Sequence, residues 1–430
     1  MQTSFSAEQL KDPQIAEANG ILRKCVHCGF CTATCPTYVL LGDELDSPRG
    51  RIYLIKNMLE KGEAAKAETV KHIDRCLSCL ACMTTCPSGV NYMHLIDQAR
   101  VHVEETYRRP LFERLLRDLL AFAMPRPHLF RLSLAAAKLA RPLAPVLGKR
   151  IAALLRLVPK YSPSPQALGA PGTYAAQGTR RGRVALLMGC VQSVLEPSIN
   201  AATIRLLTRL GFEVVVAAEE ACCGSLTHHM GKEQDALARA RRSIDQWLAA
   251  EVDAVVITAS GCGTTIKDYG HMLRLDPTYA EKAKRISSIA KDISEFLTSA
   301  GLSKAKAPQA LRVAYHSACS MQHGQNIKTL PQKLLRDAGF EVVDVPEGHL
   351  CCGSAGTYNI LQPEIAAKLR DRKIANIEQT RPEAIATGNI GCIAQIADGT
   401  AIPILHTVEL LDWAHGGPIP HAFAGDSGAI

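Results

Sequence analysis

Two copies of one cysteine spacing mark the N-terminal part of the chain. Each copy reads Cys-x2-Cys-x2-Cys-x3-Cys-Pro, the first starting at Cys25 and the second at Cys76. Two-residue gaps let a loop curl so that three sulfur atoms converge, whereas the fourth cysteine, one residue further on, points away. Runs of this form are typical of [4Fe–4S] ligation. Zinc sites are usually built from two pairs of ligands, so the pattern favours iron–sulfur clusters over zinc or disulfides.

In the bacterial ferredoxin form of this run, the fourth cysteine ligates the cluster of the other run. The sequence therefore predicts two [4Fe–4S] clusters with crossed ligation. The first cysteine set, for cluster 1, consists of Cys25, Cys28, Cys31 and Cys86. The second cysteine set, for cluster 2, consists of Cys76, Cys79, Cys82 and Cys35.

The remaining composition narrows the cellular setting. The start of the chain lacks the basic and apolar regions of a secretory signal, and the chain has 16 cysteines. Together these features favour metal ligation in a reducing compartment over a disulfide framework, so we expect a cytoplasmic protein. No apolar run is long enough for a transmembrane helix. Aromatic residues make up only 5% of the chain, which argues against a nucleic-acid partner.

The net charge of +8 is concentrated in one basic segment. Residues 108–160 carry twelve Lys or Arg against two acidic residues, a local net of +10, so the rest of the chain sums to about −2. One helical face in this segment is apolar and comprises Leu111, Leu115, Leu119 and Phe122. Short basic amphipathic helices separated by prolines suit docking to a membrane surface or to a partner protein. Packing against the neighbouring domain is the alternative.

The second half of the chain contains two copies of one unit. Cys190 aligns with Cys319, Cys222-Cys223 with Cys351-Cys352, and Cys262 with Cys392, at an offset that drifts only from 128 to 130 residues. In each copy short apolar runs alternate with helical patterns, which predicts a parallel sheet. The cysteines follow the apolar runs, so we expect them at the carboxyl ends of the strands, where open α/β sheets bind ligands.

These cysteines are candidate metal ligands whose occupant the sequence leaves open. The first unit offers Cys190, Cys222, Cys223 and Cys262, and the second unit offers Cys319, Cys351, Cys352 and Cys392. A further cluster, a zinc ion, a dithiol/disulfide pair and metal-free thiols are all compatible with the pattern. His316 precedes Cys319 on the motif loop, whereas His228 and His229 follow the first Cys-Cys-Gly.

The fold class expected from these patterns is a multidomain α+β chain. An N-terminal α-helical ferredoxin domain precedes two homologous α/β cysteine-rich units with parallel sheets. A helix is predicted between the two cysteine runs, capped by Ser47 before Pro48. The expected boundaries are 1–106 for the helical ferredoxin domain, 107–160 for the basic amphipathic segment, 161–182 for a Pro/Gly/Ser-rich linker, 183–300 for the first unit and 311–415 for the second.

Taken together, these motifs resemble the iron–sulfur subunits of membrane-linked oxidoreductases, which include glycolate oxidase, the anaerobic glycerol-3-phosphate dehydrogenase and the heterodisulfide reductases. Residues 25–38, 42–54, 258–263 and 350–358 look most like the glycolate oxidase branch. Heterodisulfide-reductase units end each copy in Cys-x2-Cys, but here the last position holds Thr265 or Gln395. The non-cubane double cluster of that branch is therefore not carried over.

The resemblance implies an electron-transfer subunit of an oxidoreductase complex on the inner face of the cytoplasmic membrane. Flavin-containing (FAD) partner subunits would oxidise glycolate or D-lactate, and this chain would pass the electrons toward quinone. The chain shows no Gly-x-Gly-x-x-Gly after a strand and no nucleophile constellation, so we expect no catalytic residue or substrate site on it.

Three alternatives stay open. In the first alternative, the chain is an iron–sulfur subunit of another respiratory dehydrogenase, acting on glycerol-3-phosphate or lactate. In the second alternative, it is a thiol or quinone reductase similar to heterodisulfide reductase. In the non-catalytic alternative, zinc stabilises the C-terminal half as a scaffold that docks flavin subunits, and only residues 21–100 carry electrons.

Overall fold

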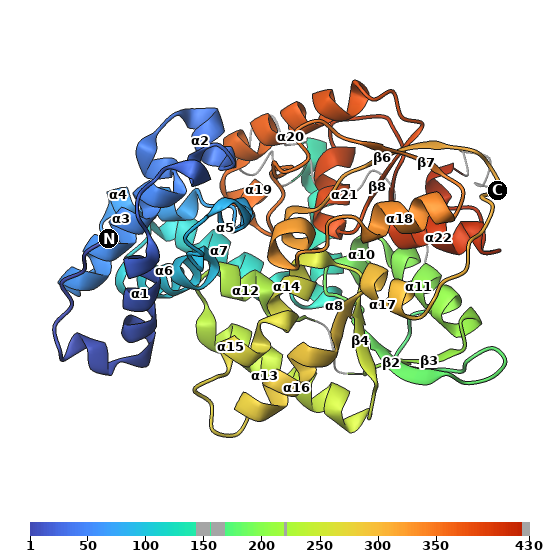
Figure 1. Cartoon of the computed structure of the whole chain (residues 1–430), viewed down its shortest axis with the longest axis horizontal. Helices are drawn as coiled ribbons and strands as arrows, with labels where there is room; N and C mark the ends of the chain where they lie inside the picture. The colour runs from blue at the N-terminus through green and yellow to red at the C-terminus, as the bar shows by residue number, and fades with distance from the viewer. Residues whose placement is uncertain (143–154, 156–167, 219–221, 424–430) are drawn as a thin grey trace.

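The two cysteine runs lie in loops of a helical N-terminal part, at one end of the molecule in Figure 1. The computed structural model describes residues 1–142, 155, 168–218 and 222–423. The N-terminal helices are α1 (Pro13–Lys24), α2 (Pro36–Leu41), α3 (Pro48–Lys61), α4 (Ala67–Asp74), α5 (Ala81–Thr85) and α6 (Tyr92–Thr106). Short turns precede or join them at η1 (Gln9–Lys11), η2 (Phe30–Thr32) and η3 (Glu44–Asp46).

The helix predicted between the runs is α3, and it begins as expected. The Ser47 hydroxyl accepts a hydrogen bond from the Gly50 amide at 3.0 Å, and Pro48 occupies the first turn, where its missing amide proton costs nothing. Ile55 of α3 packs in one apolar core with Leu22 of α1 and Leu95 of α6. This core fixes the helices from whose ends the cysteine loops extend.

Two helices, α7 (Leu111–Ala123) and α8 (Pro127–Ala140), carry the described part of the basic segment. Arg117 on α7 is buried, and its guanidinium donates to the carbonyl of Met230 at 3.3 Å. The leucines on the opposite face of α7 are exposed. Residues 143–154 and 156–160 of the predicted segment lie outside the described residues. Within the described ranges, no helix is long and apolar enough to cross a membrane.

The first cysteine-rich unit contains a five-stranded sheet in the order β1-β3-β2-β4-β5. Its strands are β1 (Gly172–Tyr174), β2 (Gly182–Leu186), β3 (Phe212–Val216), β4 (Ala254–Ile257) and β5 (Ala290–Asp292). All neighbouring strands are parallel except β1, which pairs antiparallel with β3. Its helices are α10 (Gln192–Leu195), α11 (Pro197–Arg209), α12 (Ser225–His229), α13 (Glu233–Ala249), α14 (Ser260–Lys267), α15 (Tyr269–Met272), α16 (Ala280–Ile289) and α17 (Ile293–Ser299).

The second cysteine-rich unit repeats this plan with a four-stranded parallel sheet in the order β7-β6-β8-β9. Its strands are β6 (Arg312–Tyr315), β7 (Glu341–Asp344), β8 (Ala384–Thr387) and β9 (Ile404–His406). The π-helical turn η5 (Ser320–Gly324) follows β6, and η6 (His421–Phe423) comes last. The α-helices are α18 (Leu330–Asp337), α19 (Tyr358–Leu361), α20 (Pro363–Glu378), α21 (Ile390–Ala397) and α22 (Thr407–Ala414).

The predicted fold class, a helical N-terminal part followed by two α/β units with parallel sheets, is confirmed. The apolar runs visible in the sequence did not include the short edge strands β5 and β9. They also missed β1, which lies inside the range 161–182 expected as a linker. Each of these strands has three residues, which is too short for a periodic pattern to be visible.

The two units share one apolar core and meet at the carboxyl ends of their sheets. Helices α11 and α17 of the first unit and α18 and α22 of the second contribute to this core. The amide of Ser260, beyond β4, donates to the carbonyl of Gly388, beyond β8, at 3.2 Å. The imidazole Nε2 of His406 contacts the carbonyl of Thr258 at 2.7 Å. Because the cysteines of the two units follow the strand ends, this arrangement places the cysteines of the first unit and those of the second unit in the same interior region.

Candidate metal centres

The two N-terminal cysteine loops share one backbone conformation. In the first loop His27 and Gly29 have φ angles of 55° and 87°, and in the second loop Ser78 and Leu80 have 49° and 62°. These residues occupy equivalent positions of the two runs, and left-handed backbone is uncommon outside glycine. Strained residues at matching positions indicate that each loop is held in a fixed curl by its surroundings.

The structure places the predicted ligands around two small cavities. One cavity, of about 30 Å³, is lined by the whole first cysteine set (Cys25, Cys28, Cys31 and Cys86) together with Cys82. The other, of about 20 Å³, is lined by the whole second cysteine set (Cys35, Cys76, Cys79 and Cys82). The last cysteine of each run therefore lies beside the first three cysteines of the other run.

The chemistry of these thiols fits a cationic metal group. Burial raises the pKa of Cys31 to about 11 and raises the pKa of Cys79 and Cys82 well above the usual range. Thiolates at such positions are costly unless a positive charge compensates them, and bound iron supplies that charge. The donor sets therefore suit [4Fe–4S] clusters, which take one thiolate for each iron.

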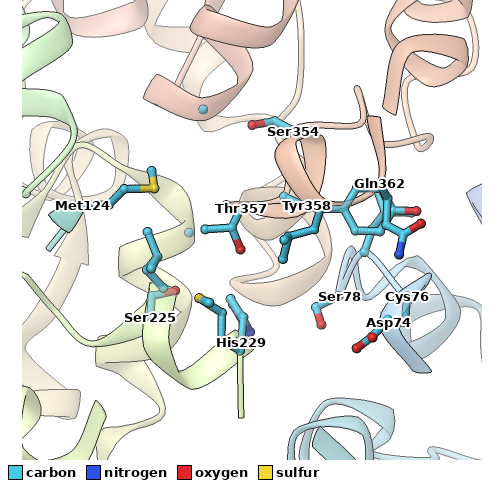
Figure 2. A pocket seen from close by; sticks show the side chains of 18 of the residues that line it. Asp74, Cys76, Ser78, Met124, Ser225, His229, Ser354, Thr357, Tyr358 and Gln362 are labelled. Carbon is cyan, nitrogen blue, oxygen red and sulfur yellow. The ribbon is translucent and has the colours of Figure 1, made fainter. Parts of the chain in front are cut away.

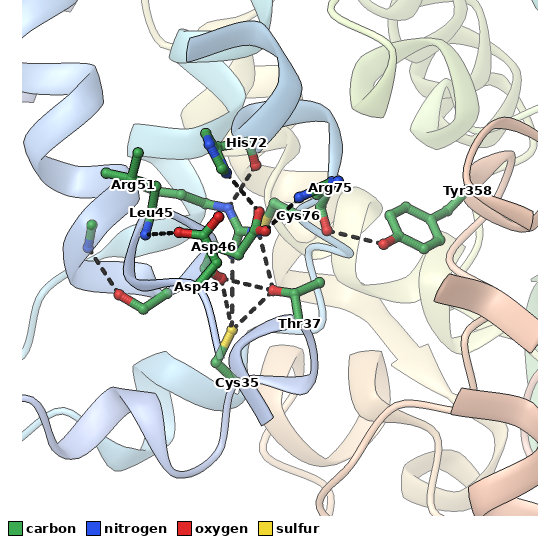
Figure 3. A network of polar contacts seen from close by, with 12 residues as sticks. Cys35, Thr37, Asp43, Leu45, Asp46, Arg51, His72, Arg75, Cys76 and Tyr358 are labelled. Atoms are coloured by element: carbon green, nitrogen blue, oxygen red, sulfur yellow. Dashed lines mark hydrogen bonds and ion pairs between the residues drawn. The ribbon is translucent and has the colours of Figure 1, made fainter. Parts of the chain in front are cut away.

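A buried ionic network lies beside Cys35, one of the predicted ligands (Figure 3). Arg51 and Asp46 are almost fully buried and form an ion pair at 3.2 Å, and the Arg51 Nη1 atom lies 3.8 Å from the Cys35 sulfur. The Asp46 carboxylate also contacts His72 Nδ1 at 2.9 Å and Arg75 Nη1 at 2.7 Å. Removal of one partner from an ion pair this deeply buried leaves an uncompensated charge, so the surroundings of Cys35 depend on both Arg51 and Asp46.

Cys76 has its own polar neighbours. The Tyr92 hydroxyl donates to the Cys76 sulfur at 3.7 Å, and Arg100 donates to the Cys76 carbonyl at 2.6 Å. Hydrogen bonds to cluster sulfurs and nearby charge set the reduction potential of a bound cluster. The sequence analysis missed Arg51, Asp46, Tyr92 and Arg100 as functional residues, because only folding brings them beside the cysteines.

In the two cysteine-rich units, the predicted ligands follow the strands as expected from the repeat. In each unit the glycine after the cysteine pair, Gly224 or Gly353, donates its amide to the first sulfur of that pair at 3.4 Å. Both glycines have positive φ angles, and a Cβ there would meet a helix carbonyl oxygen at 2.8 Å and 2.6 Å, respectively. The Cys-Cys-Gly motif therefore needs its glycine for the turn and for close helix packing.

A single cavity of about 490 Å³ joins the two units to the helical part. It lies between the second cysteine loop, with Asp74, Cys76 and Ser78, and residues of both units, including His229 and Tyr358 (Figure 2). All eight cysteines of the two units line it: Cys190, Cys222, Cys223, Cys262, Cys319, Cys351, Cys352 and Cys392. The structure thus brings together around one cavity the cysteines of the two units, which the sequence suggested only as two separate sites.

The three histidines considered as ligands have different surroundings. His228 and His229 lie next to the Asp97 carboxylate, at 3.2 Å and 3.7 Å, and so belong to the contact between α12 and α6. His316 is buried beside Cys352 and Cys392, with its ring nitrogen and both sulfurs within 4.8 Å of one another. His229 lines the shared cavity, but among the described residues only His316 of the three forms a group with cysteine thiols that is close enough to hold one metal ion.

The fold and these cysteine sets define a class of iron–sulfur protein in which a helical dicluster domain precedes two cysteine-rich α/β domains. Family models agree. Residues 21–90 match the 4Fe-4S dicluster domain, and residues 184–267 and 313–397 each match the cysteine-rich domain.

Comparison with curated proteins gives the family. The chain is 44% identical over 418 residues to the glycolate oxidase iron-sulfur subunit of Escherichia coli, covering 96% of this chain and 99% of that protein. It is 32% identical to the probable glycolate oxidase iron-sulfur subunit of Bacillus subtilis, over 88% of this chain and 89% of that protein. The chain belongs to the family of glycolate oxidase iron–sulfur subunits.

Two further similarities have lower sequence identity. Lactate utilization protein A of Bacillus licheniformis is 29% identical over 54% of this chain, which is 99% of that shorter protein. The crystal structure of a hypothetical protein from Helicobacter pylori matches with a TM-score of 0.54 at 10% identity, covering 95% of this chain and 73% of that one. This second similarity concerns the fold alone.

Proposed function

We propose that the chain is the electron-transfer subunit of a membrane-associated, flavin-dependent 2-hydroxy-acid oxidase complex, with glycolate or D-lactate as the substrate of the partner. The observation that supports it most is the convergence of eight N-terminal cysteines into two sets beside a third group of thiols. Bound [4Fe–4S] clusters would supply one-electron carriers there. Cys25, Cys28, Cys31 and Cys86 would hold cluster 1, and Cys76, Cys79, Cys82 and Cys35 cluster 2.

The packing suggests an order for the route. Cys79 of the second cysteine set shares an apolar cluster with Cys351 and Tyr358 of the second unit, and Cys319 packs against that cluster. The route would therefore run from the first cysteine set to the second and then to the second unit. The first unit faces the same cavity and would complete the path.

The cysteines of both units would act as metal ligands, holding a further cluster or zinc. Eight thiols that line one cavity, at matching positions of two repeated units, are difficult to explain as inert packing. About eight irons per chain would indicate clusters only in the N-terminal sets. About twelve irons would indicate an additional cluster, and eight irons with zinc would support the scaffold alternative.

A flavin-containing partner would oxidise the substrate and pass the electrons to this chain. The E. coli relative is named as a subunit, so an assembly is expected for this chain as well. Substrate oxidation and FAD would reside on that partner. Similarity to lactate utilization protein A over about half of the chain keeps lactate as the second candidate substrate.

Peripheral attachment to the inner face of the cytoplasmic membrane is supported by α7. Its exposed apolar residues are Leu111, Phe112, Leu115, Leu119 and Phe122. α7 itself carries Arg114 and Arg117 against Glu113 and Asp118, so the net charge of +10 in residues 108–160 comes from the residues around the helix. An exposed apolar helix face flanked by basic residues suits an anionic lipid surface.

The experiment that tests the proposal separates substrate oxidation from electron delivery. Complexes with Cys223→Ser or Cys352→Ser should keep oxidation of the 2-hydroxy acid with an artificial dye and lose oxidation linked to quinone. The exposed Ser288→Ala is the matched control and should keep both activities. Full quinone reduction by both cysteine variants, with unchanged metal content, would leave the C-terminal half as a scaffold.

A further inference from the structure

His316 is a buried histidine whose ring is not hydrogen-bonded. It follows strand β6, it is 1% exposed, and its backbone amide donates to the Ala386 carbonyl at 2.8 Å. Neither Nδ1 nor Nε2 has a hydrogen-bond partner in the described structure. Buried polar groups without partners are rare in folded proteins, and each one calls for an explanation.

Other buried histidines of the chain are hydrogen-bonded. His406 contacts the Thr258 carbonyl through Nε2 at 2.7 Å and accepts the Val408 amide on Nδ1 at 3.1 Å. His72 contacts the Asp46 carboxylate through Nδ1 at 2.9 Å. The environment of His316 is therefore unusual within this protein, and burial alone does not account for it.

The neighbours of His316 are thiols that can share a metal with it. A ring nitrogen of His316 and the sulfur atoms of Cys352 and Cys392 lie within 4.8 Å of one another. Donor atoms bound to one tetrahedral metal lie about 2.0–2.3 Å from it, so they are roughly 3–4 Å apart. The three side chains are therefore close enough to close around one ion with small movements.

The first unit lacks this imidazole. Leu187 occupies the position equivalent to His316, directly after β2, and it is buried at 1% exposure. The first unit thus has no imidazole at this position, although it repeats the fold and the cysteine positions of the second. The difference falls at one ligand position, so it changes the chemistry of the site without changing the architecture.

We propose that His316 is a metal ligand and that the second unit holds a mixed imidazole–thiolate centre with Cys352 and Cys392. The inference rests on the proposed metal occupancy of the cysteine-rich units. Zinc accepts imidazole together with thiolate, and so does iron of some iron–sulfur clusters. Either occupant uses the same donor chemistry, and the measurements below distinguish them.

The test compares three variants of the full-length chain purified without oxygen. His316→Leu installs the residue that the first unit uses, His316→Cys replaces one metal donor by another, and Cys392→Ser removes a neighbouring proposed ligand. Iron and zinc are counted per chain. X-ray absorption is then measured on the unsubstituted chain, at the edge of whichever metal the variants lose. Scattering from the outer atoms of an imidazole ring in this spectrum indicates a histidine ligand.

We expect His316→Leu to lose the same metal equivalents as Cys392→Ser, and His316→Cys to retain them without imidazole scattering. The EPR signals of the two N-terminal clusters should stay unchanged in all three variants. Retention by His316→Cys distinguishes the loss of a ligand from misfolding, because a cavity effect would not be repaired by a thiol.

Two outcomes would overturn the inference. If Cys392→Ser loses metal but His316→Leu keeps full metal content and unaltered absorption spectra, His316 is not a ligand and the proposed occupancy survives. If neither variant changes the metal content, the second unit holds no metal, and both the occupancy and the role of His316 fall together.

Discussion

The hydroxyl of Tyr358 donates a hydrogen bond to the carbonyl oxygen of Arg75 at 3.0 Å (Figure 3). Arg75 immediately precedes Cys76 of the second cysteine set, and Tyr358 follows the Cys351-Cys352 pair of the second unit. The bond ties the backbone beside a proposed cluster loop to the start of α19, the helix that follows the Cys-Cys-Gly loop of the second unit. A fixed separation between redox groups is what an electron-transfer chain requires, so this contact supports the proposed order of the route.

The crossed ligation can be tested with single cysteine variants. Cys35→Ser should damage the same cluster as Cys79→Ser, although Cys35 belongs to the first run, because both line the second cavity. Cys28→Ser should damage the other cluster, because Cys28 lines the first cavity with Cys86. EPR of each reduced variant identifies the missing signal. Loss of one and the same signal in Cys35→Ser and Cys28→Ser, with the other spared, would mean that each run holds its own cluster.

Tyr92→Phe should lower the reduction potential of cluster 2. The Tyr92 hydroxyl donates to the Cys76 sulfur, and such a donor stabilises the more negative, reduced cluster. A hydrogen bond contributes about 1 kcal/mol, which corresponds to roughly 40 mV for one electron. An EPR-monitored redox titration of the isolated chain measures the shift.

Tyr358→Phe is the matched control for this potential. It removes a hydroxyl from the same neighbourhood, but that hydroxyl bonds to a carbonyl and not to a sulfur. The variant should leave the potential of cluster 2 within a few millivolts. Equal shifts in both variants would show that general loss of polarity, and not the bond to sulfur, sets the potential.

The sequence predicted those features that depend on local spacing. Short stretches of residues reveal the helix after Ser47, the repeated strand–helix pattern and the cysteines that belong to each Cys-Cys-Gly unit. The small edge strands were missed because three residues are too few to show the alternation of apolar and polar residues that marks a strand. The cavity shared by both units was missed because it depends on how the ends of β4 and β8 meet, which no local pattern encodes.

Buried charge was the least predictable feature. Arg117 lies among other arginines in a basic stretch of the sequence, yet it is buried and donates to the carbonyl of Met230, the residue after α12. Arg51 likewise reads as a surface residue of an amphipathic helix, but Asp46, five residues earlier, pairs with it beside Cys35. Such residues are identified only when the partner from another turn or element is in place.

The contact between α6 and α12 should weaken as pH rises. Burial alone would lower the pKa of His228, but the Asp97 carboxylate raises this pKa above its ordinary 6.5. Burial would raise the pKa of Asp97, but His228 and His229 hold it well below its usual range. A raised histidine pKa contributes stability that is complete below pH 6.5 and is lost as pH rises through the raised value. His229 counteracts part of this effect, since burial lowers its pKa, and Arg100 and Asp268 are the other charged groups near the pair.

Anaerobic thermal unfolding from pH 6 to pH 9 measures this dependence. The melting temperature should fall across the range in the unsubstituted chain, and His228→Gln should flatten the fall. Replacement of His128, an exposed histidine on α8, by Gln is the control and should leave the slope unaltered. The same slope in His228→Gln would remove His228 from the explanation.

The exposed apolar face of α7 should bind anionic membranes. Leu115 and Leu119 are 57% and 59% exposed and lie one turn apart. Arg114 beside them makes a long contact with Asp118 at 3.9 Å, and its side chain is exposed. Each leucine would contribute roughly 1.5–3 kcal/mol on burial. Cations near an anionic surface add about 1 kcal/mol each. Both contributions favour lipid over water, and the second is screened by salt.

Flotation with phosphatidylglycerol and phosphatidylcholine vesicles separates these contributions. Leu115→Ser combined with Leu119→Ser should weaken binding to anionic vesicles at least tenfold, whereas Arg114→Gln should weaken it less and mainly at low salt. Leu275→Ser, at a similarly exposed leucine of the first unit, is the matched control and should bind normally. If the double variant still floats like the unsubstituted chain, α7 is not the lipid-binding surface. If it floats normally but no longer co-purifies with the flavin subunits, the apolar face of α7 is the docking surface for that partner.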